Sequence, residues 1–432
     1  MNHCAVLDIG KTNKKCFVFD EGYHIVLERT AQLPETTDED GEPCEDLDLL
    51  NAWVFQTVLD VLSETRFNVR GLNVATYGAS FVHLDANSQA LTPLYNYLKP
   101  FPDDLRKRFF EAYGDEATMA LETASPNLGN LNSGSQLYWL KHRKPMVFKQ
   151  IKWSLHLPQY VAWLIQSVIS KELPQTITQI DITSIGCHTM LWDFRKNGYH
   201  EWVKSEGIVE KFPVVAPSSM NEGVLPLLEH RSGVHVGGGV HDSSAALIPY
   251  LASFTKPFVL ISTGTWCISL NPFNQEPLTT AELAEDCLCY LTFEGKPVKA
   301  ARYFGGKEHH LKVMELAATF GVAEDFYTDI QLHGASDIDI AYLGFMRQLV
   351  EKQAASTRLA LGNSSVQRIF VDGGFSKNEI YMTLLAQAFP EMEVCAAEIA
   401  QSTALGAAMA IHLSWNPNKL PENLISLQKY EP

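Results

Sequence analysis

Short apolar runs separated by polar turns open this chain. Residues 5–10 are mainly apolar, residues 11–14 are polar, and residues 15–20 are again mainly apolar. Two apolar strands around a short polar turn predict a β-hairpin. The same arrangement returns at residues 258–270, where an apolar run enters Thr263-Gly264-Thr265 and a second apolar run follows.

Helical spacing of apolar residues predicts the helices between these hairpins. Residues 48–66 place Leu50, Val54, Val58 and Val61 on one helix face. The acidic stretch at residues 35–48 predicts a solvated loop instead. The other predicted elements are helices at 103–123, 134–171, 306–321, 339–361, 377–389 and 402–412, and strands at 72–78, 81–85 and 368–372.

Two similar strand-turn-strand units, each followed by mixed α and β sequence, predict an α/β protein of two related halves. The length of 432 residues fits two or three domains at ~150 residues each. We place the domain boundary between residues 252 and 253.

Charge and composition narrow the function classes. There are 34 Lys and Arg against 50 Asp and Glu, a formal charge of −16, which makes nucleic acid and anionic membranes poor partners. No apolar run reaches the ~18 residues of a membrane span, and no basic segment precedes the first apolar run as in a signal peptide.

The eight cysteines contain no Cys-x-x-Cys pair, which predicts a cytoplasmic protein without structural zinc. Domains of this size are compatible with a homo-oligomer, but no interface signature is visible.

Two tight turns are candidates for phosphate binding. The stretch 8–15 (DIGKTNKK) combines a carboxylate, a glycine and small polar residues, whose backbone N–H groups can wrap an anion. The turn at 263–265 repeats this chemistry in the second half. A plain surface hairpin is the alternative for each turn alone, whereas the pair together favours a polyphosphate ligand.

Two further segments have both a structural and a functional interpretation. Residues 372–378 (DGGFSKN) run from a strand through Gly-Gly into a helix, which either allows a ligand close to the backbone or simply makes a turn. Asp242 stands where a loop enters a helix, as an N-cap or as a general base. The pair His309-His310 predicts a solvated helix start rather than a metal site.

Taken together, these segments resemble the FGGY carbohydrate kinases, within the superfamily of sugar kinases, heat-shock ATPases and actin. The rhamnulokinase and fuculokinase branch is the most similar. The matching stretches occur in family order and span nearly the whole chain: 7–13, 75–81, 239–245, 262–266 and 372–378.

The resemblance implies two ribonuclease-H-like (actin-like ATPase) domains, 1–252 on the sugar side and 253–432 on the nucleotide side, with a cleft between them. It implies that Asp242 is the general base and that Asp8 holds Mg²⁺ through water. The residues implied to bind ATP are Gly10, Thr12, Asn13, Lys14, Thr263, Gly264, Thr265, Gly373, Gly374 and Asn378. Those implied to lie near the sugar are Gly78, Ala79, Ser80, His241 and Asp242.

The implied function is ATP-dependent phosphorylation of a small ketose or deoxyketose, of pentulose or 6-deoxyhexulose type, by direct in-line transfer. Two alternatives stay open: a non-catalytic protein that binds ATP and sugar, and a superfamily kinase that acts on a carboxylate. The chain departs from the family at residues 95–99 (YNYLK), where many members carry an arginine. The stretch 129–133 (GNLNS) either supplies sugar-hydroxyl contacts in its place or is only a turn.

Overall fold

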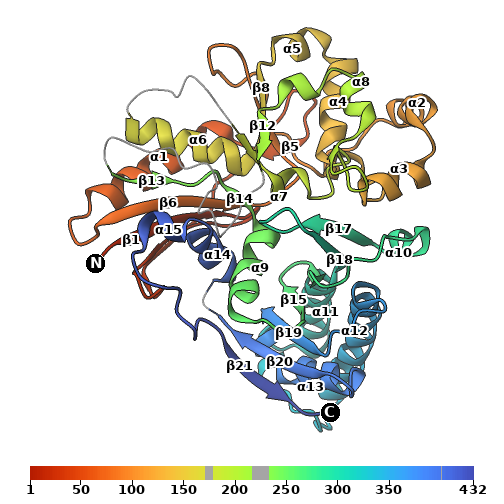
Figure 1. Cartoon of the computed structure of the whole chain (residues 1–432). Helices are drawn as coiled ribbons and strands as arrows, with labels where there is room; N and C mark the ends of the chain where they lie inside the picture. The colour runs from red at the N-terminus through yellow and green to blue at the C-terminus, as the bar shows by residue number, and fades with distance from the viewer. Residues whose placement is uncertain (171–178, 217–232, 400) are drawn as a thin grey trace. The chain divides into compact units, whose positions relative to one another are not determined.

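The computed structural model describes residues 1–170, 179–216, 233–399 and 401–432 (Figure 1). The chain divides into two compact units. Unit 1 comprises Met1–Leu251, Cys289–Pro297 and Ala400–Glu422, and unit 2 comprises Ala252–Leu288, Val298–Ile399 and Asn423–Pro432. The two later segments of unit 1 thus lie far along the chain from its first 251 residues.

Unit 1 is built on a six-stranded sheet in the order β13-β6-β1-β2-β3, with β14 also paired to β6. The predicted first hairpin is confirmed, because β1 and β2 pair antiparallel, as do β2 and β3. In contrast, β6 runs parallel to β1 and to both β13 and β14. The strands are β1 (His3–Ile9), β2 (Lys14–Phe19), β3 (Ile25–Ala31), β6 (Val69–Thr76), β13 (His235–Val236) and β14 (Val240–His241).

Helices cover both faces of this sheet. Figure 1 shows α1 (Leu47–Ser63) and α6 (Leu157–Ser170) on one side of β1 and β6, and α14 (Ser402–Ala410) and α15 (His412–Trp415) on the other. A strand covered on both faces is apolar on both faces, which explains the unbroken apolar run of residues 4–7. Gly71 in β6 leaves room for Trp415, since a Cβ there would stand 2.9 Å from the indole ring.

A second core in unit 1 is aromatic and helical, with Phe109, Tyr138 and Trp202 packed edge to face. Two predicted helices are broken here. The 103–123 prediction splits at Gly114, whose φ is 110°, into α2 (Asp103–Tyr113) and α3 (Glu116–Thr123). The 134–171 prediction is interrupted by a strand, and its last residue lies outside the described residues. It becomes α4 (Ser133–Arg143), α5 (Pro145–Gln150), β8 (Trp153–His156) and α6, and β8 pairs with β7 (Phe81–Leu84).

The acidic stretch at residues 35–48 is not the solvated loop that we predict from its composition. It forms the small hairpin β4 (Glu35–Thr37) and β5 (Pro43–Glu45). Asp38 and Glu45 are each only 6% exposed. Lys99 pairs with Asp38, and Lys14 pairs with Glu45. Partners from distant parts of the chain therefore allow these carboxylates to be buried.

Unit 2 repeats the sheet plan of unit 1. β15 (Val259–Thr263) and β16 (Cys267–Asn271) form the second predicted hairpin, and β15 pairs in parallel with β19 (Arg368–Gly373), as β1 does with β6. The sheet order is β17-β18-β16-β15-β19-β20-β21. This shared topology confirms the prediction of two related halves.

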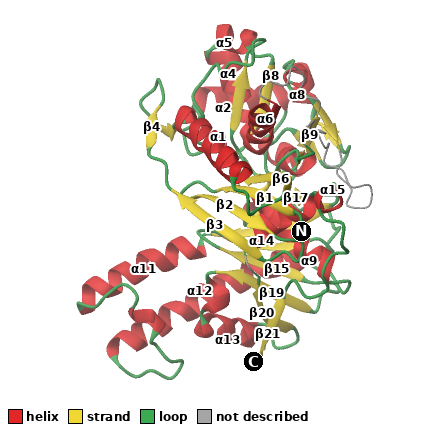
Figure 2. Cartoon of the chain, turned by 90° about the vertical axis from the view of Figure 1, so that its left-hand side faces the viewer, coloured by secondary structure: helices red, strands yellow, loops and turns green. Residues whose placement is uncertain are grey.

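Three helices pack together along one side of these strands (Figure 2), and each confirms a predicted helix. They are α11 (Gly305–Phe320), α12 (Asp337–Leu361) and α13 (Glu379–Ala388). The remaining elements are η1 (Gly129–Leu131), β9 (Gln179–Asp181), α7 (Ile182–Ile185), β10 (Trp192–Asp193), β11 (Gly198–Tyr199), α8 (Glu201–Ser205), η2 (Val209–Lys211), β12 (Val214–Ala216), α9 (Asp242–Ser253), α10 (Thr280–Ala284), β17 (Cys287–Leu291), β18 (Pro297–Tyr303), η3 (Phe326–Thr328), η4 (Phe375–Lys377), β20 (Glu393–Glu398) and β21 (Ser426–Tyr430). No helix in the described part of the chain is long and apolar enough to cross a bilayer.

Candidate active site

Asp8 and Asp242 meet at one edge of the unit 1 sheet. Asp8 pairs in register with Ala75 of β6, and Ala75 pairs with Val240 of β14. All three strands are parallel, so their carboxyl ends share an edge, the usual place for ligands in parallel sheets. Asp242 follows β14 directly as the first residue of α9.

The charge of Asp242 acts on Asp8. Burial, followed by the charge of Asp242, raises the pKa of Asp8 to about 7, and Lys15 offsets only part of this rise. Two carboxylates placed together disfavour the doubly ionised state. Oxygen ligands of this kind suit a hard divalent cation such as Mg²⁺, whose charge would relieve the repulsion.

The side chain of Lys14 holds the first tight turn, residues 10–13, by hydrogen bonds to its backbone. The N–H of Gly10 donates to the carbonyl of Asn13 at 2.9 Å, and Thr12 at the tip is exposed. The Lys14 side chain is 2% exposed, and its ammonium group donates to the carbonyls of Gly10 and Lys11 and pairs with Glu45. Its three N–H donors are thus used within the protein, where they hold the turn together.

The predicted sugar-side residues form a tight turn after β6. Ala79 has a left-handed φ of 63°, and the Gln136 side chain holds its carbonyl with a 2.7 Å hydrogen bond. Gly78 packs beside the ring of His241, and Ser80 is buried. The turn is therefore built from contacts with residues distant in the sequence.

In unit 2, Thr263 ties the second tight turn to the Gly-Gly segment after β19. Its hydroxyl donates to the carbonyl of Asp372 and accepts from the N–H of Phe375. Gly373 has a φ of 82°, and a Cβ there would stand 1.9 Å from the carbonyl oxygen of Thr263. Only glycine fits this position. The next two turn residues, Gly264 and Thr265, are exposed.

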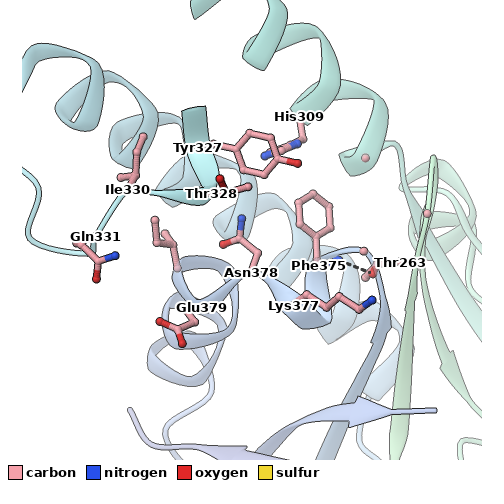
Figure 3. Close-up of a pocket in the computed structure, with 14 residues that line it drawn as sticks. Thr263, His309, Tyr327, Thr328, Ile330, Gln331, Phe375, Lys377, Asn378 and Glu379 are labelled. Atoms are coloured by element: carbon pink, nitrogen blue, oxygen red, sulfur yellow. Dashed lines mark hydrogen bonds between the residues drawn. The ribbon is translucent and has the colours of Figure 1, made fainter. Parts of the chain in front are cut away.

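A pocket of about 730 Å³ opens beside this junction (Figure 3). Four predicted ATP-binding residues line it: Thr263, Gly264, Gly374 and Asn378. Asn378 caps α13 by accepting the N–H of Tyr381, and its amide donates to the hydroxyl of Tyr342. The sequence analysis does not assign the other lining residues to ATP binding; they are Gly306, His309, Tyr327, Thr328, Ile330, Gln331, Phe375, Lys377, Glu379 and Ile380.

His309 belongs to an aromatic part of the pocket wall. The imidazole ring of His309 contacts the rings of Tyr327 and Phe375 edge to face, with 5.0 and 5.2 Å between the ring centroids. Burial lowers the pKa of His309 to about 4, so it is neutral at pH 7. The prediction of a solvated helix start holds for the exposed His310 and is wrong for His309. A neutral aromatic wall suits a flat heterocycle rather than a phosphate.

Residues of the departing stretch 95–99 and of the stretch 129–133 make contacts within the fold. Lys99 pairs with Asp38 and Asp40 at 2.5 and 2.6 Å and lies over the ring of Trp139. Asn132 is fully buried, and its amide donates to Ser125 and to the carbonyl of His188. The turn interpretation of residues 129–133 is thus correct for Asn132.

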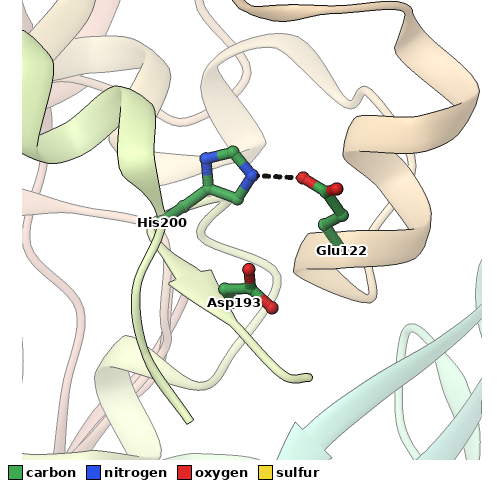
Figure 4. A group of neighbouring side chains, drawn as sticks. All are labelled: Glu122, Asp193 and His200. Carbon is green, nitrogen blue, oxygen red and sulfur yellow. Dashed lines mark hydrogen bonds and ion pairs between the residues drawn. The ribbon is translucent and has the colours of Figure 1, made fainter. Parts of the chain in front are cut away.

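Glu122, Asp193 and His200 gather in unit 1 with the spacing of metal ligands (Figure 4). Burial raises the pKa of Glu122, but hydrogen bonds from His200 and Arg195 outweigh this effect and lower it overall. Arg195 and Lys196 also pair with Asp193. Arg195 and Lys196 already compensate the two carboxylates, so the cluster is an ion-pair network that joins α3, β10 and His200, the residue before α8.

Comparison with known proteins defines the class. Residues 4–249 match the N-terminal domain of the FGGY family of carbohydrate kinases, and residues 255–330 and 341–415 match C-terminal domains of that family. The first match alone covers more than half of the chain. The chain therefore belongs to the FGGY family of carbohydrate kinases.

Individual relatives agree with the expected branch. Over 195 residues the chain is 27% identical to a rhamnulokinase of Halalkalibacterium halodurans, covering 45% of this chain and 40% of that protein. Over 303 residues it is 23% identical to an L-fuculokinase of Salmonella typhi, covering 64% and 60%. The matches thus span only 40% and 60% of the length of these relatives.

The fold is shared with solved carbohydrate kinases. The structure of a carbohydrate kinase from Novosphingobium aromaticivorans superposes with a TM-score of 0.78 at 21% identity, covering 99% of this chain and 94% of that chain. This likeness confirms the predicted mixed α/β fold with two actin-like ATPase domains.

Proposed function

We propose that this protein transfers the γ-phosphoryl group of ATP to a hydroxyl of a small ketose, of pentulose or 6-deoxyhexulose type, with Asp242 as the general base. The observation that carries this proposal is the placement of Asp242 beside Asp8 at the carboxyl edge of the unit 1 sheet. A carboxylate there, with 36% of its side chain exposed, can accept the proton of an attacking hydroxyl.

Within this proposal the two units carry different tasks. In unit 1 the turn at residues 10–13 offers backbone N–H groups to phosphate, and Asp8 would hold Mg²⁺. That ion, when bound, supplies positive charge to the phosphates. In unit 2 the aromatic wall of His309, Tyr327 and Phe375 would take the adenine ring, while the exposed Gly264–Thr265 turn would face the phosphates.

Catalysis then rests on placement more than on covalent chemistry. Phosphoryl transfer needs an aligned acceptor, a compensated phosphate charge and the exclusion of water. Asp242 draws the proton from the hydroxyl as the oxygen attacks. A non-catalytic binding protein has no need for such a carboxylate, and this disfavours the alternative.

The test is ADP release by the purified protein with ATP, Mg²⁺ and a panel of ketoses. We expect turnover with at least one ketose, and a loss of about 10²–10⁴-fold in kcat for Asp242→Asn. The matched control is Asp103→Asn, an equal change at a side chain that is 91% exposed, which should leave kcat unchanged. Absence of turnover on every sugar, or full turnover by Asp242→Asn, would contradict the proposal.

A further inference from the structure

A short chain of hydrogen bonds links Asn378, Tyr342 and His309 at the unit 2 pocket. Asn378 and His309 line the pocket (Figure 3), whereas Tyr342 is fully buried and does not line it. The amide nitrogen of Asn378 lies 3.1 Å from the hydroxyl oxygen of Tyr342, and this oxygen lies 3.0 Å from Nε2 of His309. The direction of each hydrogen bond decides which nitrogen of the imidazole carries a hydrogen.

The direction is set at the start of α13. The backbone N–H of Tyr381 can only donate, so the Asn378 atom that faces it at 2.9 Å is the amide oxygen. The amide nitrogen therefore faces Tyr342 and donates to its hydroxyl oxygen. The hydroxyl hydrogen of Tyr342 then needs an acceptor of its own.

Nε2 of His309 is that acceptor. Tyr342 is 0% exposed, and within the described ranges its hydroxyl has no partner besides Asn378 and His309. The opposite direction, from Nε2–H to the hydroxyl, would leave the hydroxyl hydrogen buried without an acceptor, which is costly. Nε2 thus carries no hydrogen, and the ring carries its hydrogen on Nδ1.

The Nδ1–H group of His309 is a donor that the fold does not use. No hydrogen bond from the described part of the chain reaches Nδ1, and Nδ1 is not one of the buried polar atoms that lack a partner there. It is therefore open to solvent, on a side chain that lines the pocket. The rings of Tyr327 and Phe375 contact the imidazole edge to face and limit its rotation.

We propose that His309 binds the nucleobase, with Nδ1–H donating to one ring nitrogen of adenine, and that Tyr342 is a positioning residue that keeps this hydrogen on Nδ1. Adenine fits such a donor because its ring nitrogens N1, N3 and N7 are hydrogen-bond acceptors. The inference rests on the proposed function, since it takes the pocket to hold the base of ATP. It adds one directed polar contact to the aromatic wall.

Nucleotides that lack a single ring nitrogen test this contact. ADP and its 1-deaza, 3-deaza and 7-deaza analogues are titrated into the wild type and into His309→Phe by calorimetry. In the wild type we expect one analogue, the sensitive one, to bind about tenfold more weakly than ADP, because its C–H group leaves Nδ1–H without an acceptor. In His309→Phe the sensitive analogue and ADP should bind equally, within about twofold, because phenylalanine keeps a ring there but has no donor.

Two further variants separate the donor from the shape of the ring. We expect Tyr342→Phe to reduce the discrimination against the sensitive analogue to about threefold or less, because the hydrogen of His309 is then free to move to Nε2. The matched control is His310→Phe, the same change at the next residue, which is exposed and does not line the pocket. It should bind all four nucleotides as the wild type does. Thermal unfolding checks that the three variants fold.

The outcomes distinguish this inference from the proposed function. Equal binding of ADP and all three analogues to the wild type would overturn the role of His309 and leave the proposed function standing. If His309→Phe weakens ADP and the sensitive analogue by the same factor, the role of His309 is purely structural and the proposal fails. Unchanged discrimination in Tyr342→Phe would overturn the positioning role of Tyr342. A wild type that binds no ADP would instead contradict the proposed function, and this inference with it.

Discussion

A single buried ion pair shapes the first tight turn. Lys14 and Glu45 lie 3.1 Å apart with side-chain exposures of 2% and 6%, and Glu45 also accepts the hydroxyl of Tyr77 at 2.8 Å. The pair joins the β1–β2 turn to β5 and to the end of β6. The turn geometry therefore depends on residues 31 and 63 positions further along the chain.

Loss of one partner should be costly. We expect Lys14→Met to lower the free energy of unfolding by about 3 kcal/mol, because Glu45 loses its buried partner and keeps, among the described cations, only Lys11, at 3.7 Å. Urea denaturation measures this change. Lys312→Met is the control, since Lys312 is 30% exposed, pairs only with the exposed Glu315 among the described residues, and should contribute about 0–1 kcal/mol. The double variant Lys14→Met/Glu45→Gln should recover part of the loss, and equal effects of the two single lysine variants would contradict this account.

At the scale of elements, the β7–β8 pair carries two histidines that the fold keeps neutral. His83 pairs with Ser154 across the strands, and Phe81 pairs with His156. Burial lowers the pKa of His83 to about 3, and burial with the nearby His241 and His83 lowers that of His156 to about 3. Both histidines titrate near 6.5 once the chain unfolds.

This difference makes stability depend on pH. Because the folded pKa is the lower one, the contribution of each histidine is fully present above about pH 6.5 and is lost as the pH falls from there toward 3. When the pH falls from 7.5 to 5.5, we expect the free energy of unfolding of His83→Leu to decrease by about 1.4 kcal/mol less than that of the wild type. Urea denaturation at the two pH values measures this difference.

The comparison with the variant is needed because two carboxyl groups act in the opposite direction. Burial raises the pKa of Asp181 to about 7, and Asp8 has a similarly raised pKa. The contributions of Asp181 and Asp8 to the free energy of unfolding increase as the pH falls. They are the same in the wild type and in His83→Leu, so they cancel when the two proteins are compared. Identical pH dependence in the wild type and His83→Leu would show that His83 is protonated in the folded state.

For the whole molecule, the pocket that we propose for the nucleotide belongs to unit 2, and the carboxylate pair belongs to unit 1. We expect Tyr327→Ala to raise the KM for ATP about tenfold, because it removes an aromatic wall against which a base can stack. The KM for the sugar should stay unchanged in steady-state assays. Phe320→Ala, at an exposed aromatic outside the pocket, is the control. An equal rise in both KM values would contradict this division of tasks.

Much of this protein follows from the sequence alone. The two hairpins, the helices at 48–66, 339–361 and 377–389, and the strands that precede the candidate residues all depend on neighbours within a few positions, and periodicity reports such neighbours. The ordered motifs also gave the family, and with it Asp8, Asp242 and the Gly-Gly turn. The composition of residues 35–48 was a poorer guide, because their acidic side chains predicted a solvated loop whereas two of the carboxylates are buried.

The tertiary structure alone decided which polar groups face one another. Lys14 forms a buried ion pair with Glu45, and His309 lines an aromatic pocket. Oδ1 of Asp242 accepts the N–H of Ser243. Each of these facts depends on which distant segment lies beside the residue and shields it from water. Burial and pairing set the charge and direction of a side chain, and no pattern of neighbours along the chain encodes them.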